Sequence, residues 1–126
     1  MIKIGQPPFL ECSSKGDKRF SAFYARLKCM DNKSIEEIYQ ASKIFDDGST
    51  NLTITQCKGK KAINMDYCAK IYSWAWKKYF EENPDLLEYA KKFNGFSDIF
   101  GKPNCQCQAI EIYNIVKGDM HARHTL

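Results

Sequence analysis

The sequence has no long apolar run, because charged or polar side chains interrupt every apolar stretch after a few residues. A membrane-spanning helix needs about 20 predominantly apolar residues, and a signal peptide needs a charged segment followed by an apolar one. We therefore expect no membrane span, no signal peptide and a cytoplasmic protein. In that compartment the six cysteines are expected to be free thiols.

Arginine and histidine are scarce. Sixteen of the nineteen basic residues are lysine, there are two histidines, and the net charge is only +4. The basic residues are interleaved with acidic ones, whereas a duplex-binding protein carries a continuous basic stripe and reads base edges with arginine. We expect a small anionic, nucleotide-like ligand as the partner, with no nucleic acid and no membrane.

Metal-type ligands gather at one place only, where Cys105 and Cys107 precede His121 and His124. Paired cysteines of zinc sites are usually separated by two to four residues, so this Cys-x-Cys spacing is short for zinc. We expect neither a metal nor a cofactor.

A chain of 126 residues with 44% hydrophobic and 13% aromatic residues is expected to form one domain with a real core. Its extent is predicted as residues 1–118, because Gly118 ends the last apolar pattern. The remaining residues, 119–126, are predicted to be a flexible C-terminal tail.

Hydrophobic patterns predict an α+β fold, with four main helices packed on a small sheet built from the N-terminal third. The expected strands are 1–4, 9–12, 20–27 and 52–55, and apolar groups on both sides make 20–27 a central strand. The expected helices are 34–43, 66–80, 83–93 and 103–117. Asn83 is predicted to be an N-cap, with Pro84 at the first helical position.

The helix that begins at Ser34 has the clearest local signals. Ser34 and Glu37 have the spacing of a capping box, and Ile35 and Ile38 begin a buried stripe. A second stripe carries Glu36, Gln40 and Lys43, at steps that return side chains to one face of a helix. The two interpretations are a ligand site beside an apolar wall and an ordinary solvated helix flank.

Two basic turns suit a phosphate, because glycine lets the backbone approach and lysine supplies charge. The first lies within 13–19 and the second within 58–61. The alternative for both is an ordinary charged turn. Their candidate ligand residues are Lys15, Gly16, Lys18, Arg19, Lys58 and Lys60.

Three further residues are singled out by their positions in the sequence. Asp98 stands between apolar residues, where burial of a carboxylate costs free energy unless the charge is paired or has a catalytic role. It is therefore either a turn residue or a catalytic residue. Trp76 belongs by its spacing to the core stripe of its helix. Gln106, near the start of the last helix, is a candidate ligand contact because helix N-termini favour anions.

The segments Phe20–Tyr24, Ser34–Glu36 and Tyr39–Lys43 resemble the opening of the NADAR superfamily. A looser similarity continues through 58–61 and 78–87. The resemblance implies an N-glycosidase acting on ADP-ribose or phosphoribosyl conjugates. It also places Trp76 at the edge of the pocket, stacked on a ring.

The resemblance implies roles for the polar residues. Cleavage of an N-glycosidic bond passes through an oxocarbenium-like sugar, which a carboxylate stabilises while another group protonates the departing nitrogen. We assign Glu36 to the first role and Asp98 to the second. Lys43 is either a phosphate partner or an amine nucleophile. The expected aromatic and amide contacts are Phe23, Tyr24, Tyr39 and Gln40.

Two departures from the family pattern keep alternatives open. Glu37 stands where the resemblance leads us to expect histidine, and the closing Trp-Gly element is absent. The main alternative is a non-catalytic, phage-type protein that sequesters a nucleotide or ADP-ribose-like signal. An adaptor without a small ligand, which uses its aromatic residues at a protein interface, is the third.

Overall fold

The computed structural model describes residues 1–103 and 105–124, and within them the fold is α+β as predicted. The helices are α1 (Ile35–Ala41), α2 (Met65–Glu82), α3 (Pro84–Ala90) and α4 (Gln108–His124). The strands are β1 (Ile2–Gly5), β2 (Phe9–Glu11), β3 (Arg26–Leu27), β4 (Lys33–Ser34) and β5 (Gly95–Asp98). Short 3₁₀ helices span Lys18–Phe20 and Lys28–Met30.

The main sheet has three strands in the order β1-β5-β2. β5 pairs antiparallel with β1 and parallel with β2, and all four of its residues are buried. β1 and β2 confirm the strands expected at 1–4 and 9–12. The central strand, however, comes from residues 95–98, so the sheet is not built from the N-terminal third alone.

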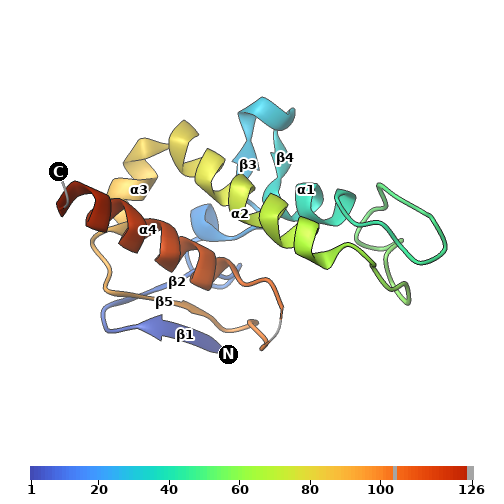
Figure 1. The fold of residues 1–126 in the computed structure, drawn as a ribbon. Helices are drawn as coiled ribbons and strands as arrows, with labels where there is room; N and C mark the ends of the chain where they lie inside the picture. The colour runs from blue at the N-terminus through green and yellow to red at the C-terminus, as the bar shows by residue number, and fades with distance from the viewer. Residues whose placement is uncertain (104, 125–126) are drawn as a thin grey trace.

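The helices enclose one core beside this sheet (Figure 1). α4 packs on β5 and β1, while α2 crosses the molecule and packs against α1, α3, α4 and β3. α2 contributes deeply buried residues to this core, with Ala75 and Trp76 fully buried and Phe80 nearly so. No helix in the described parts of the chain is both long and apolar enough to span a membrane.

The segment 20–27, expected to be the central strand, is mostly not a strand. Only its last two residues pair, in the small two-stranded sheet with β4. The preceding residues form turns, in which the amides of Tyr24 and Ala25 both donate to the carbonyl of Ser21. Phe20, Ala22 and Ala25 are all buried, although the segment turns instead of running as a strand. The turns therefore explain why apolar residues occur at both even and odd positions.

Two other expectations were wrong in detail. Residues 52–55 contain turns and no strand. α4 begins at Gln108 and continues through Gly118 to His124, so glycine does not end it and the expected tail is largely helical. The predicted start at 103–104 includes Asn104, which lies outside the described residues.

Candidate functional site

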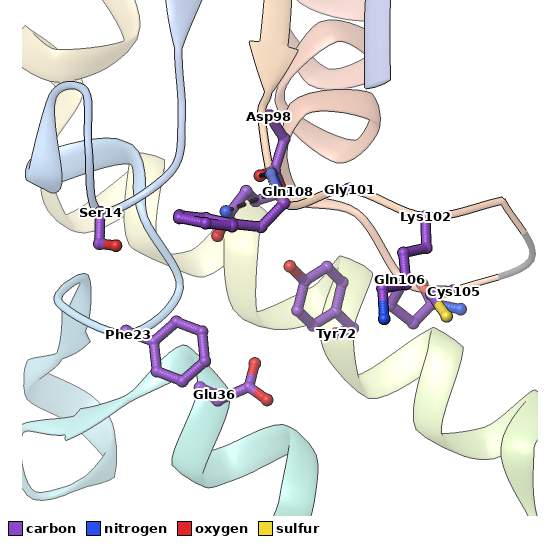
Figure 2. A pocket seen from close by; sticks show the side chains of 11 residues that line it. Ser14, Phe23, Glu36, Tyr72, Asp98, Gly101, Lys102, Cys105, Gln106 and Gln108 are labelled. Carbon is purple, nitrogen blue, oxygen red and sulfur yellow. Dashed lines mark hydrogen bonds between the residues drawn. The ribbon is translucent and has the colours of Figure 1, made fainter. Parts of the chain in front are cut away.

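A cavity of about 250 Å³ lies where the start of α1, the middle of α2, the end of β5 and the loop before α4 meet (Figure 2). Small-molecule pockets usually have volumes of roughly 300–1,000 Å³, so this cavity lies slightly below that range. Its lining residues are Ser14, Phe23, Glu36, Tyr72, Asp98, Phe100, Gly101, Lys102, Cys105, Gln106 and Gln108.

Glu36 enters the cavity from the first turn of α1, and this placement follows from local sequence. Ser34 accepts a hydrogen bond from the amide of Glu37, and the Glu37 carboxylate accepts one from the amide of Ser34. This predicted capping box is confirmed, and it fixes where α1 begins. The Glu36 carboxylate accepts a hydrogen bond of 2.8 Å from Gln40 Nε2, as expected for side chains one turn apart.

Tyr72 supplies a phenol opposite that carboxylate. Figure 2 shows its hydroxyl directed into the space between the Glu36 helix and the end of β5. Burial raises the pKa of Tyr72 well above 10, and the charge of Glu36 raises it further. The hydroxyl therefore stays protonated at neutral pH and is available as a hydrogen-bond donor. Tyr72 shares the apolar stripe of its helix with Trp76, and this spacing by itself indicates only a core residue.

Asp98 lies at the cavity wall, but its carboxylate is held by protein groups. One oxygen accepts a hydrogen bond from the Phe100 amide at 3.0 Å, and the other accepts one from Gln108 Nε2 at 3.0 Å. Gln108 in turn accepts a hydrogen bond of 2.7 Å from the Ala22 amide. The buried chain Asp98–Gln108–Ala22 connects β5, α4 and the turn before β3, which matches the turn-residue interpretation.

The rest of the lining comes from two loops. Ser14 and Phe23 belong to the chain before β3, whereas Phe100, Lys102 and Gln106 belong to the loop between β5 and α4. Phe23 and Gln106 were predicted as ligand residues from sequence. Lys102 was not, because a single exposed lysine in a loop gives no sequence signal.

Other predicted residues of the α1 stripe lie outside the lining of the cavity. α1 ends at Ala41, so Lys43 follows the helix, and its Nζ lies 5.0 Å from the centre of the Tyr39 ring. Tyr39 is buried and makes an edge contact with Tyr72. Gln40 touches the site only through Glu36. Of the three-residue polar stripe, the cavity receives Glu36 alone.

The first basic turn contributes Ser14 to the cavity and none of its charges. Arg19 forms a two-pronged ion pair with Asp17 and lies 4.8 Å from the centre of the Tyr89 ring. Lys18 lies over Tyr24, and Lys15 is exposed. Gly16 is required by packing rather than by a ligand, because a Cβ there would lie 2.3 Å from the carbonyl oxygen of Glu11.

The remaining candidates are also remote from the lining. Lys60 forms an ion pair with Asp47, and Lys58 is exposed in the same loop region. Tyr24 is half exposed beside Lys18. Trp76 is fully buried, so its ring is a core element and has no free face on which a ligand could stack.

All six cysteines are free thiols, and two of them lie near the cavity. Cys105 lines it, while Cys107 is buried and directs its thiol toward Asp98 at 3.8 Å. Burial raises the pKa of the Cys107 thiol, so it is a weak hydrogen-bond donor and not a nucleophile.

Comparison with known proteins gives no match: no protein-family model matches the sequence, and neither does any curated protein.

Proposed function

We propose that the protein hydrolyses the N-glycosidic bond of a phosphoribosyl or ADP-ribose conjugate. The main support is that Glu36, Phe23 and Gln106, each predicted as a site residue from sequence, line one cavity although Gln106 lies far from the other two in the chain. The NADAR resemblance suggests the reaction class, and the cavity offers the carboxylate of Glu36 and the phenol of Tyr72.

The proposed reaction uses Glu36 as the base. The bond between the sugar carbon and the nitrogen breaks, its electron pair stays on the nitrogen, and the carboxylate stabilises the positive sugar. A water oxygen bonds to that carbon and gives a proton to Glu36. Tyr72 donates a hydrogen bond to the departing nitrogen, water supplies the proton that this nitrogen takes up, and solvent accepts the proton from Glu36.

Tyr72, and not Asp98, is the group that we place beside the departing nitrogen. Both oxygens of Asp98 already accept hydrogen bonds from the protein, whereas the phenol of Tyr72 is directed into the cavity. Lys102 likewise replaces Lys43 as the candidate partner for a phosphate, since it is the one lysine in the described part of the chain that lines the cavity.

Binding without hydrolysis is the second candidate function. It is favoured by the same hydrogen bonds of Asp98, because they leave the cavity with one available carboxylate where a glycosidase usually has two. A sequestering protein returns its ligand intact, and an enzyme returns base and sugar. Mass spectrometry of the recovered ligand separates the two.

The test compares Glu36→Gln with its neighbour Glu37→Gln on NAD, ADP-ribose and nucleoside 5′-monophosphates. Glu36→Gln should lower turnover by about 10²- to 10⁴-fold, which is the usual contribution of a general base, and leave ligand affinity nearly unchanged. Glu37→Gln makes the same chemical change one residue away. Glutamine also completes a capping box, so this control should keep wild-type turnover.

Two results would contradict the proposal. One is equal turnover by Glu36→Gln and wild type. The other is recovery of every bound ligand intact from wild type, which would leave the sequestering function. Binding of no nucleotide at all would leave the adaptor interpretation.

A further inference from the structure

Exposed phenylalanine rings gather at the cavity. The sequence has eight phenylalanines, and two of them, Phe23 and Phe100, are exposed, with exposed fractions of 54% and 58%. The other six are buried or partly buried. Both exposed rings line the cavity that holds Glu36.

Local sequence does not explain this coincidence. Phe23 belongs to the turns before β3, and Phe100 follows β5, so the two rings are 77 positions apart in the chain. Exposing a phenyl ring to water is unfavourable. A ligand that covers both rings at this cavity therefore lowers the free energy by removing their apolar surface from water. A flat heteroaromatic ring suits this position, because it stacks on phenyl faces while its edges stay polar.

The rest of the lining limits the size and charge of the ligand. Among the described residues Lys102 is the one cation in the lining, and Gln106 adds an amide from the same loop. One ammonium matches one phosphate. The cavity volume of about 250 Å³ suits a mononucleotide better than a dinucleotide, which needs a larger pocket.

We propose that the ligand is a nucleoside monophosphate or its conjugate, whose base packs against Phe23 and Phe100 and whose phosphate pairs with Lys102. This inference rests on the proposed function and names its substrate class. Phe100 and Lys102 thereby become specificity-determining residues that the sequence alone did not identify.

The test measures affinity by calorimetry in the Glu36→Gln background, so that no ligand is consumed. The probes are AMP, GMP, CMP, UMP and nicotinamide mononucleotide, with ribose 5-phosphate as the ligand without a base. Phe23→Ala and Phe100→Ala should each weaken binding of the best nucleotide by about 5- to 150-fold, the usual effect of losing one base–aromatic stack. Neither should change the affinity for ribose 5-phosphate.

Two further variants sharpen the result. Tyr67→Ala removes a ring with a similar exposed fraction, 56%, from the first turns of α2, outside the cavity lining, and should bind like the parent. Lys102→Ala should weaken nucleotides and ribose 5-phosphate by the same factor. All three mutated rings are exposed, so thermal unfolding should confirm that the variants fold.

The outcomes distinguish this inference from the proposed function. Unchanged nucleotide affinity in both phenylalanine variants, equal affinity for ribose 5-phosphate and nucleotides, or binding of no probe would overturn the inference. If the phenylalanine variants weaken binding but wild type releases no base, the inference stands and the glycosidase proposal fails.

Discussion

Glu11 is the residue that connects the loops around the cavity. Its carboxylate accepts hydrogen bonds from the amide of Ser13, the hydroxyl of Ser97 and the amide of Ile99. Ser13 precedes the cavity residue Ser14, and Ile99 precedes Phe100. Burial raises the pKa of Glu11, but these hydrogen bonds outweigh burial, and the pKa lies below its ordinary value of 4.5.

We predict that Glu11→Gln lowers the free energy of unfolding by about 1–3 kcal/mol at neutral pH, because an amide nitrogen would face donors that need an acceptor. The pKa of Glu11 is lower in the folded state. Its stabilising contribution is thus present above pH 4.5 and is lost as the pH falls through the folded pKa. Urea unfolding between pH 3 and pH 7 should show wild type and variant converging toward acid.

The matched control for this prediction is Glu81→Gln, which removes an exposed carboxylate paired only with Lys78. It should change the free energy of unfolding by less than about 0.5 kcal/mol. A constant difference between Glu11→Gln and wild type at every pH would contradict the assigned role of the Glu11 charge.

At the scale of elements, α1 is short and depends on its cap to hold Glu36. Removing a serine N-cap usually costs about 1 kcal/mol, within a range of about 0.5–2 kcal/mol. We predict this loss for Ser34→Ala, measured by chemical denaturation. Because both hydrogen bonds of the box share the same two residues, Ser34→Ala and Glu37→Ala should together cost less than the sum of the single changes. Strict additivity would contradict the reciprocal cap.

Elements with local signals were predictable, and elements held by distant partners were not. The capping box located α1, and the apolar stripe located α2, because both signals lie within one helix. Asn83 is at the predicted N-cap position of α3, but its side chain instead donates to the carbonyl of Tyr79 and so satisfies the end of α2. The choice between two neighbouring helix ends depends on how the helices meet.

At the scale of the whole molecule, β5 joins the two halves of the chain. It was missed because four buried residues that include glycine and aspartate show no alternation. Gly95 begins this strand where space is minimal: a Cβ would lie 2.5 Å from the Phe9 ring and 2.6 Å from the carbonyl oxygen of Gln6.

We predict that Gly95→Ala destabilises the protein by about 1–3 kcal/mol, the usual effect of overpacking, since both contacts belong to neighbouring parts of the sheet. Gly118→Ala is the opposite case. Gly118 lies inside α4 with nothing within 4 Å of the added Cβ, so alanine should stabilise by about 0.5–1 kcal/mol. Thermal unfolding of both variants should give shifts of opposite sign, and a common sign would contradict this account.

The candidate site was only partly predictable for the same reason. Glu36 and its contact with Gln40 follow from helical spacing, which is local. Tyr72, Phe100 and Lys102 join them only through the packing of α2 and of the loop after β5. Asp98 was correctly singled out as unusual, but whether its oxygens face a ligand or protein donors depends on Gln108 in α4.

The sequence by itself determined the α+β class, the existence of four helices in the described chain, and the helix face that carries Glu36. Those features follow from propensity, spacing and capping, which act over a few residues. Tertiary structure decided which strand is central, which charges remain outside the cavity, and which aromatic rings reach it. Such choices depend on contacts between segments far apart in sequence, and the energies of these contacts cannot be inferred from a pattern within a few residues.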